Sequence, residues 1–532
     1  MEKYNRNIKT FDELLRQCAK EGGTQTAFSY KISKKVTAEK SFSSLYDDVV
    51  KLSVSLDKMG FAGEHIAIIG ENRIEWIETF FAVCRVGSVA VLLDKDCSSD
   101  ELGQFLQRSN CKAAFYSDSY KKKIDVLKES MPNVGFISFG SVGELIKSSD
   151  DSHQINCNKN ENDVSLIVFT SGTTGISKGV MLSQKNILSN ALAAFDRLYD
   201  ELESCNKILM LLPLHHTFGL VTGAIVPLMK LGHAYICDSL RRVTKDIQAQ
   251  KPDLLFVVPV IAETIYKKIL SEIQSQGKLN SFNRGVKINN FLKRFNIDLS
   301  RKLFADIHST FGGNLKSIIC GGAPIGKEYI QGFCDIGIEF LNGYGITECS
   351  PIVSVNGFGK NNKIGSVGAP LCCNGVRIKD PDTDGIGMVE VRGSNVMLGY
   401  LNDDKSTKEV MDGEWFITGD CGKFDKDGFL YLTGREKNLI ILSNGKNVSP
   451  EGIETKLLFN NLIEEVVVSD QNGKITAEIY PNQNSFSGNE KDIYKVIDEY
   501  NKTVPPYKNI EKIIIRSKEF SKTSTMKIKR QK

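Results

Sequence analysis

The segment at 169–179 is the part of the chain best suited to bind an anion. It reads Phe-Thr-Ser-Gly-Thr-Thr-Gly-Ile-Ser-Lys-Gly, with a strand-like run before it and a helix-like run after it. Its glycines let backbone N–H groups converge on an anion, and its hydroxyls and lysine add further donors. A flexible linker is the alternative, but linkers rarely join a buried strand to a helix. Because the Walker pattern is absent, we expect a different triphosphate loop, made by Thr170, Ser171, Gly172, Thr173, Thr174, Gly175 and Lys178.

This segment closely resembles the phosphate loop of the adenylate-forming superfamily, which includes acyl-CoA synthetases, peptide-synthetase adenylation domains and beetle luciferases. The resemblance covers nearly the whole chain, because six further motifs follow in the family's order. They are LPLHHTFG at 212–219, GGAP at 321–324, NGYGITE at 342–348, WFITGD at 415–420, GREK at 434–437 and KTSTMK at 522–527. A single motif of this kind would be weak support, whereas six in order leave little room for chance.

The motif that ends at Glu348 contains residue types that suit binding of the nucleotide phosphates. A carboxylate among phosphate contacts would be repulsive without a cation, so we expect Glu348 to bind Mg²⁺, which prefers oxygen ligands. The resemblance implies that Thr347 donates to the α-phosphate and that Tyr344, beside Gly345, stacks on adenine. The alternative for Glu348 is a solvated surface carboxylate.

A second carboxylate, Asp420, is expected to accept hydrogen bonds from two ribose hydroxyls, as carboxylates do in other nucleotide sites. Arg435 would hold the ribose or phosphate side of the nucleotide. Gly321, Gly322 and Ala323 would line the adenine and acyl pockets, where small residues allow close approach. The alternative for Asp420 is a turn-forming residue beside a glycine.

Three further roles are implied by the resemblance. His216 is favoured over His215 as the residue that gates the acyl pocket, although either could be an ordinary core histidine. Lys437 occupies the family's hinge position, where a charged side chain stays solvated while backbone dihedrals change. Lys527 matches the lysine that stabilises charge developing between the carboxylate and the α-phosphate. A solvated basic tail is the alternative there, and Met526 stands where relatives carry glycine.

The elements that must position these residues alternate between strand-like and helix-like runs over the first 350 residues. Apolar runs at 65–69 and 88–93 flank a helical stripe formed by Ile74, Ile77, Phe80, Phe81 and Cys84. Further strands are expected at 164–169, 207–212, 234–237, 254–258 and 315–320, with a helix near 185–199. Such β-α-β units predict parallel sheets with helices on their faces.

The pattern changes twice toward the C-terminus. From about 363, short runs separated by glycines indicate a small β-barrel or a twisted antiparallel sheet. Beyond 435, strands at 465–468, 476–480 and 512–516 surround a helix at 491–501. We therefore expect an α/β protein with an N-terminal adenylate-forming domain over 1–434, which includes a β-rich subdomain at about 363–434. A hinge at 435–437 would join it to a small mobile α+β domain over 438–532.

Bulk composition excludes several classes of protein. The 532 residues carry a net charge of only +4, which argues against a dedicated nucleic-acid binder. The 13 cysteines are scattered and there are six histidines, so neither a zinc site nor a disulfide framework is expected. No secretory leader is apparent, and the longest apolar runs are about half the roughly 20 residues that span a bilayer. We expect a cytoplasmic protein without a transmembrane segment, and peripheral membrane contact stays open.

The motifs together predict a ligase that activates a carboxylic acid with ATP and Mg²⁺ as acyl-AMP, releases pyrophosphate and transfers the acyl group to CoA. The segment at 442–450 resembles that of long-chain acyl-CoA synthetases, and its Ser443, Asn444 and Gly445 are assigned to the thiol channel. The segments expected to line the acid pocket, 218–226 and 256–262, are apolar except for Thr222, so they lack an anion for an amino acid's ammonium.

The acid and the acceptor each have alternatives at this point. A fatty acid is the leading prediction, and an aryl acid is second. A phosphopantetheine group on an acyl carrier protein offers the same thiol as CoA. A catalytically inactive nucleotide-binding regulator is the remaining alternative, although Glu348, Asp420, Arg435 and Lys527 are all present.

Overall fold

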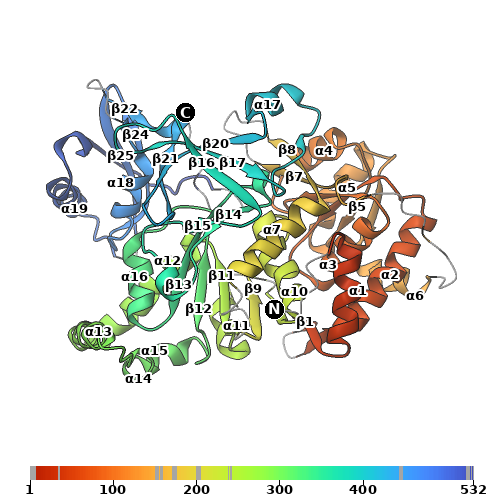
Figure 1. Cartoon of the computed structure of the whole chain (residues 1–532), viewed down its shortest axis with the longest axis horizontal. Helices are drawn as coiled ribbons and strands as arrows, with labels where there is room; N and C mark the ends of the chain where they lie inside the picture. The colour runs from red at the N-terminus through yellow and green to blue at the C-terminus, as the bar shows by residue number, and fades with distance from the viewer. Residues whose placement is uncertain are drawn as a thin grey trace.

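The computed structural model describes residues 8–33, 36–149, 155, 160–170, 177–198, 205–237, 239, 242–442, 447–483, 485–522, 528 and 530. Two large sheets, with helices packed on them, make up the N-terminal part, and smaller sheets follow toward the C-terminus (Figure 1). No helix in these ranges combines the length and the apolar character needed to cross a membrane.

The first large sheet has seven strands, in the order β18-β8-β7-β4-β3-β5-β6. They are β3 (His65–Ile69), β4 (Val89–Leu93), β5 (Cys111–Tyr116), β6 (Gly135–Ser138), β7 (Val164–Thr170), β8 (Lys178–Ser183) and β18 (Gly399–Tyr400). β3 to β7 pair in parallel, and helices such as α3 (Ile74–Arg85) connect them. The predicted β-α-β unit is therefore confirmed.

One local expectation in this sheet is wrong. The phosphate-loop segment does not lead directly into a helix, because β8 lies between them and pairs antiparallel with β7. Val180 and Leu182 belong to the core that contains α3, whereas Met181 between them packs on the cluster at the opposite face, as the period of two in a strand requires. The helix α7 (Gln184–Arg197) begins only after this strand, with Ser183 as its N-cap.

The second large sheet has nine strands, in the order β15-β14-β13-β12-β11-β9-β10-β1-β2. They are β1 (Thr26–Lys31), β2 (Thr37–Ser41), β9 (Lys207–Met210), β10 (His233–Ile236), β11 (Leu254–Val257), β12 (Ser317–Cys320), β13 (Glu339–Gly345), β14 (Ile352–Val355) and β15 (Ala369–Pro370). The run from β1 to β13 is parallel, so the carboxyl ends of β11, β12 and β13 meet at one edge.

The two large sheets share a core, and strand alternation divides their side chains between faces. Ile208 and Met210 of β9 join the core that also contains α3 and α7. Leu209 points the other way, into a second cluster under α12 (Pro259–Ser275) and α16 (Lys327–Asp335). Each face of the nine-stranded sheet is thus covered, as parallel sheets require.

Beyond residue 370 the described part of the chain forms three smaller sheets. One is the two-stranded pair of β22 (Ile440–Ile441) and β23 (Asn447–Val448), and the other two are larger. The first is antiparallel, with β16 (Asn374–Lys379), β17 (Gly387–Gly393), β19 (Met411–Asp412), β20 (Trp415–Phe424) and β21 (Leu430–Arg435). The second has β24 (Ile463–Gln471), β25 (Lys474–Pro481) and β26 (Lys512–Ile515). With α18 (Pro450–Leu457) and α19 (Glu490–Thr503), this last sheet has a hydrophobic core of its own.

Candidate active site

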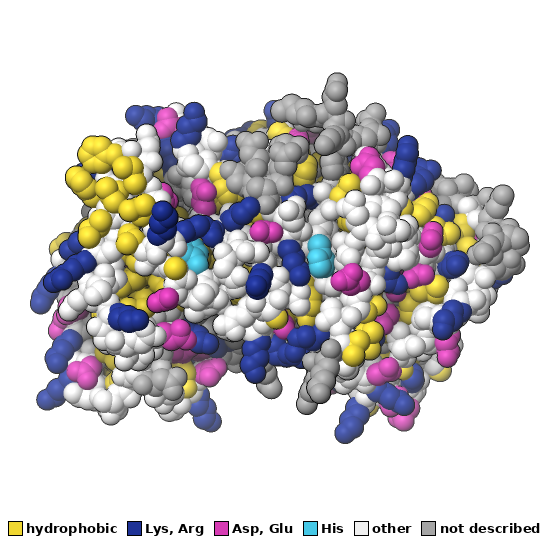
Figure 2. Space-filling model, turned by 90° about the horizontal axis from the view of Figure 1, so that it is seen from below, with side chains coloured by type: hydrophobic (Ala, Val, Ile, Leu, Met, Phe, Trp, Pro, Cys, Tyr) yellow, Lys and Arg dark blue, Asp and Glu magenta, His cyan; other side chains and the backbone are white. Residues whose placement is uncertain are grey.

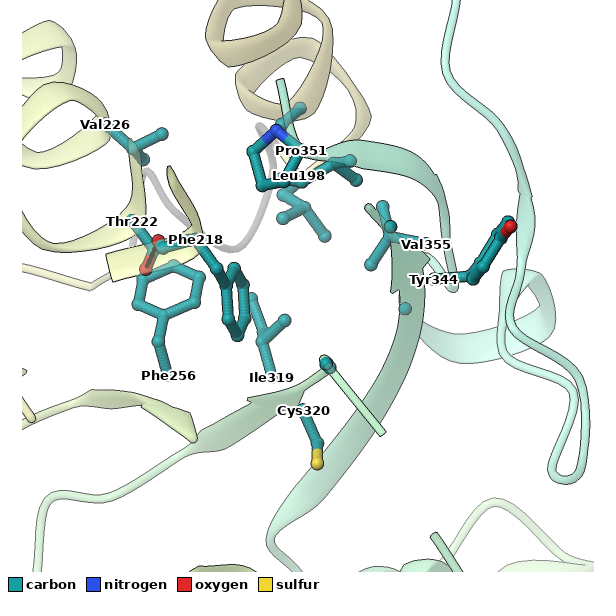
Figure 3. Close-up of a pocket in the computed structure, with 16 residues that line it drawn as sticks. Leu198, Phe218, Thr222, Val226, Phe256, Ile319, Cys320, Tyr344, Pro351 and Val355 are labelled. Atoms are coloured by element: carbon teal, nitrogen blue, oxygen red, sulfur yellow. Dashed lines mark hydrogen bonds between the residues drawn. The ribbon is translucent and has the colours of Figure 1, made fainter. Parts of the chain in front are cut away.

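An apolar pocket lies where the carboxyl ends of β11, β12 and β13 meet α7 and the helical segment α9–η3–α10. That segment consists of α9 (Thr217–Leu220), η3 (Val221–Ile225) and α10 (Val226–Lys230). The pocket holds about 610 Å³ of empty space, part of it open to solvent. Both segments predicted to line the acid pocket contribute, through Phe218, Thr222, Val226 and Phe256 (Figure 3).

The lining of this pocket is uncharged throughout the described residues. Thr222 is the polar side chain among the helical contributors, but its hydroxyl donates to the Phe218 carbonyl oxygen at 2.6 Å. The Thr222 hydroxyl is therefore already used within the helix, which leaves little hydrogen-bonding capacity for a substrate. Figure 3 shows Phe218, Phe256 and Thr222 close together, with Tyr344 on the opposite side of the cavity. Such a cavity suits an apolar group.

Glycines form the side of the pocket nearest Tyr344. Gly321 and Gly322 follow β12, and Gly322 has φ +90°, a conformation that favours glycine. Gly345 ends β13, and a Cβ there would lie 2.2 Å from the carbonyl oxygen of Pro351. The two strands β13 and β14 can therefore approach closely only with glycine at 345. Ala323 follows this edge and is partly buried.

Tyr344, Asp420 and Arg435 form a hydrogen-bonded group beside this edge. The Tyr344 hydroxyl donates to Asp420 Oδ2 at 2.6 Å, and Arg435 Nε donates to Asp420 Oδ1 at 2.9 Å. Asp420 and Arg435 are register partners on β20 and β21, which fixes their separation. Burial is the largest single influence on the Arg435 pKa and lowers it, but Asp420, Tyr344 and Glu348 together outweigh burial and raise this pKa. The three predicted residues, which lie up to 91 positions apart (435 minus 344), are thus brought together.

Glu348 lies in a short 3-10 helix, η5 (Thr347–Cys349), directly after the pocket strand β13. Its Oε1 accepts a hydrogen bond from the Tyr400 hydroxyl at 3.0 Å, and the ammonium of Lys178 lies 4.6 Å from the centre of the Tyr400 ring. Burial and the Glu348 carboxylate raise the pKa of Tyr400, so this phenol stays protonated as a donor. Tyr400 therefore joins the predicted metal ligand to the predicted phosphate-binding lysine.

No cluster of three or more His, Cys, Asp or Glu side chains that could hold a metal ion occurs in the described part of the chain. A metal ion at Glu348 would therefore not be held by a cage of three such side chains from this part of the chain. This donor set fits Mg²⁺, which binds one or two carboxylates together with substrate phosphates and water, rather than a metal that needs a protein cage.

The phosphate-loop prediction falls partly outside the described residues. Thr170 and Lys178 are register partners at the ends of β7 and β8, and they flank the loop. Arg108 donates to the Ser177 carbonyl oxygen at 2.8 Å and fixes one side of its base. Residues 171–176, which include the predicted Ser171, Gly172, Thr173, Thr174 and Gly175, are not among those described.

His215 and His216 lie side by side before α9, with ring centroids 4.3 Å apart. Burial lowers the pKa of each to about 3, so both are neutral at physiological pH. His215 Nε2 is 3.6 Å from Asp94 Oδ1. Neither ring is among the described residues that line the pocket, although Phe218, two residues beyond His216, is.

The remaining predicted residues belong to the C-terminal part. Lys437 is exposed in the 3-10 helix η7 (Glu436–Asn438), immediately after Arg435. Ser443, Asn444, Gly445 and Lys527 lie outside the described residues. The flanks of 523–527 are anchored, because Lys522 forms an ion pair with Glu465. On the other side, Arg530 contacts Glu454 at 2.5 Å.

Sequence reasoning missed several contributors to this site. Tyr400 belongs to none of the recognised motifs. It lies in the segment 396–402, where an apolar run leads into a turn. Leu198, Ile319 and Val355 line the pocket from three different elements. Their apolar periodicity marks them as buried, but it does not reveal that they face a cavity rather than a packed core.

Comparison with known proteins identifies related chains. A family model described as AMP-binding enzyme matches residues 14–401, and one described as AMP-binding enzyme C-terminal domain matches 437–532. The long-chain-fatty-acid–CoA ligase FadD15 of Mycobacterium bovis is 28% identical over 456 residues, which cover 80% of this chain and 74% of the relative. A feruloyl-CoA synthase of an Amycolatopsis species is 27% identical over 426 residues, which cover 78% and 77%.

Solved structures share the fold. The crystal structure of the anthranilate CoA ligase AuaEII in complex with anthranoyl-AMP has a TM-score of 0.80 at 19% identity, covering 97% of this chain and 95% of that one. A Mycobacterium tuberculosis fatty acyl CoA synthetase has a TM-score of 0.68 at 22% identity, covering 98% and 97%. The large N-terminal α/β part and the small C-terminal part are therefore those of this group of structures.

Proposed function

This chain belongs to the AMP-binding enzyme family and is an AMP-forming acid–CoA ligase, and we propose that the acid it activates is a fatty acid. The observation that carries this proposal is the uncharged and predominantly apolar lining of the pocket. The pocket begins at the glycine edge beside Tyr344 and extends to Phe218, Phe256 and Val226. An acyl chain could bury its methylenes there while its carboxylate stays near the nucleotide.

The reaction has two steps, formation of acyl-AMP and transfer of the acyl group to CoA. A carboxylate oxygen of the acid attacks the α-phosphorus of ATP, the α–β phosphoanhydride bond breaks, and pyrophosphate leaves. The CoA thiol then loses its proton and attacks the acyl carbon, and AMP leaves as the acyl–phosphate bond breaks. The first step needs a nucleotide held rigidly beside the acid, because correct positioning supplies much of the rate enhancement.

We assign the nucleotide to the group formed by Tyr344, Asp420 and Arg435. Asp420 would accept from the ribose hydroxyls, and its hydrogen bonds from Tyr344 and Arg435 support this role because they fix its orientation. The same Tyr344 hydroxyl bond constrains how the ring could stack on adenine. Thr347 would donate to the α-phosphate from η5, one residue before Glu348.

We assign Mg²⁺ to Glu348. When bound, the metal would neutralise charge on the departing pyrophosphate. Tyr400 would orient the Glu348 carboxylate, and Lys178 would approach the phosphates from the opposite side of the Tyr400 ring. Their positions support this assignment, because Lys178 begins β8, the strand that follows the phosphate-loop segment, and Tyr400 lies on β18, which pairs with β8.

We also propose that the chain has two domains joined at 435–437, with Lys437 as the pivot. Few hydrogen bonds cross this boundary in the described residues. The Tyr329 hydroxyl donates to the Leu458 carbonyl oxygen at 3.0 Å, and the backbone N–H of Leu439 donates to the Arg435 carbonyl oxygen at 3.1 Å. Such sparse contacts support a rotation between the two steps, which would bring Lys527 to the site for adenylation and the segment at 443–445 for thiol attack.

An ATP–pyrophosphate exchange assay with a panel of acids tests the substrate assignment. Exchange should increase with acyl chain length and then level off, since each buried methylene adds up to about 0.8 kcal/mol. A preference for acetate or amino acids would refute the fatty-acid proposal.

An aryl acid is the second candidate, and the similarity to a feruloyl-CoA synthase favours it. Phe218 and Phe256 could pack on an aromatic ring as well as on an alkyl chain. If the exchange rate in the same panel is highest with cinnamic-type acids, the aryl-acid assignment is supported over the fatty-acid assignment. Supplying either CoA or a phosphopantetheine-bearing acyl carrier protein as acceptor then identifies the preferred thiol.

A further inference from the structure

The surface formed by α13 (Leu279–Lys293) and the segment that continues to 303 exposes a concentrated group of hydrophobic side chains. Of the fifteen large hydrophobic side chains that are exposed in the described ranges, five fall within 288–303. They are Ile288, Phe291, Phe295, Ile297 and Leu303, and they are between 46% and 62% exposed. Scattered exposed hydrophobic residues need no explanation, but a contiguous group marks an interaction surface. We call residues 277–303 the α13 surface.

The exposure of these side chains is fixed by the anchoring of the opposite side of the helix. Ile288, Phe291 and Phe295 follow one another at three- and four-residue spacing and form one stripe, with the two phenylalanine rings 5.4 Å apart. Asn289 points the other way and is fully buried. It donates to Asp298 Oδ1 at 3.2 Å and accepts from the Leu299 N–H at 2.8 Å.

Positive charge surrounds this stripe. Residues 277–303 contain seven basic side chains and one acidic side chain, a net charge of +6 (7 minus 1), whereas the whole chain is only +4. The rest of the chain is therefore net negative (4 minus 6), so the basic excess is concentrated here. The basic residues are Lys278, Arg284, Lys287, Lys293, Arg294, Arg301 and Lys302. In Figure 2, hydrophobic side chains bordered by lysine and arginine gather at the left end, where Figure 1 places α13.

We propose that the α13 surface docks the enzyme onto a membrane that contains anionic lipids. Phenylalanines on one stripe with lysines and arginines beside it are the composition of helices that lie in the headgroup region of a bilayer. Phenylalanine and arginine are also enriched at protein–protein interfaces, but lysine is depleted there, and four of the seven basic residues of this surface are lysines, which favours the membrane. This proposal concerns lipid binding and does not depend on which acid is activated.

Vesicle sedimentation with the full chain, without ATP or acid, tests the proposal. The protein should sediment with vesicles of phosphatidylcholine containing about 30 mol% phosphatidylglycerol, less with phosphatidylcholine alone, and less again as salt increases. Phe291→Ser with Phe295→Ser should weaken binding by roughly tenfold or more, because binding scales with the apolar area inserted. Lys287→Glu with Arg294→Glu and Lys302→Glu should abolish the preference for anionic vesicles.

Matched controls use exposed residues elsewhere. Ile32→Ser with Tyr494→Ser removes exposed hydrophobic side chains, and Lys112→Glu with Lys121→Glu and Lys122→Glu reverses exposed charges on the seven-stranded sheet and its helices. Both control variants should bind vesicles like the wild type.

Two results would overturn the proposal. The first is equal vesicle binding by wild type and the charge-reversal variant of the α13 surface. The second is a wild-type dimer in analytical ultracentrifugation that the phenylalanine variant dissociates while vesicle binding is unchanged, which would make the surface an interface between copies. Unchanged thermal unfolding and unchanged exchange activity without lipid confirm that each variant is folded.

Discussion

Replacing Tyr400 by phenylalanine tests the idea that Glu348 must be oriented to hold Mg²⁺. The substitution removes one hydroxyl, which donates to Glu348 at 3.0 Å, and keeps the ring beneath the Lys178 ammonium. A hydrogen bond to a charged group contributes about 1.5–3 kcal/mol, and each 1.4 kcal/mol is about a factor of ten. Glu348 is only partly buried, so water can replace part of the lost bond. We therefore expect the lower limit, a decrease of about tenfold in adenylation rate.

The assay is ATP–pyrophosphate exchange measured across a range of Mg²⁺ concentrations. Tyr400→Phe should need more Mg²⁺ to reach half its maximal rate, a change that a general loss of stability would not produce. Tyr494→Phe, which removes an exposed hydroxyl on α19, is the control and should behave like the wild type.

A double-mutant cycle completes this test. Glu348→Gln alone should slow exchange by roughly 100-fold, as for loss of a preorganised electrostatic contact. Adding Tyr400→Phe to Glu348→Gln should then cost little more, because the two residues act as one unit. If the effects multiply fully, or if Tyr400→Phe has the Mg²⁺ dependence of the wild type, the reasoning is refuted.

Four further predictions use other parts of the site. Lys527→Ala should reduce the adenylation rate about 100- to 1000-fold. The same variant should form thioester from synthetic acyl-AMP and CoA at near the wild-type rate. If Lys529→Ala shows the adenylation defect instead, Lys529 is the adenylation lysine. Lys437→Pro, which fixes φ near −65°, should slow thioester formation more than exchange, and equal slowing of both would place the pivot elsewhere. Gly345→Ala should impair exchange because its Cβ would lie 2.2 Å from the Pro351 carbonyl oxygen, whereas Gly143→Ala, with open space around it, should be harmless. Burial lowers the pKa of His215 to about 3 from its ordinary 6.5, so the unfolded state binds the extra proton and stability falls as pH decreases from 6.5 toward 3. Denaturant unfolding between about pH 7.5 and pH 5 should show that loss, by up to about 1.4 kcal/mol per pH unit for this residue, and His215→Gln should make the slope shallower.

Sequence periodicity was sufficient for the parallel sheets but not for the site's surroundings. The unit formed by β3, α3 and β4 could be predicted, because its apolar spacing switches from strand to helix and back. The strand β8 was missed because the glycine-rich segment before it and the helix after it dominate the local pattern. Its alternating Val180 and Leu182 were the available signal.

The site itself was predictable where the family resemblance marked residues by motif. Asp420 and Arg435 could be assigned in this way, but nothing in the sequence indicates that they are register partners on adjacent strands. Tyr400 could not be found, since it reaches Glu348 only because β18 pairs with β8 across a sequence separation of more than 200 residues. Long-range pairing of this kind is a property of topology, which local patterns do not encode.

The arrangement of these residues explains why the site needs several sheets at once. Tyr344 belongs to the nine-stranded sheet, Asp420 and Arg435 to the five-stranded sheet, and Tyr400 to the seven-stranded sheet. The hydrogen bond from Tyr344 to Asp420 therefore joins two sheets, and the bond from Tyr400 to Glu348 joins the seven-stranded sheet to η5, which lies between β13 and β14 of the nine-stranded sheet. A change in packing between sheets would separate these partners without touching any of them. Substitutions in the core shared by the two large sheets should for this reason reduce adenylation before they unfold the chain, because catalytic geometry fails at displacements of about 1 Å.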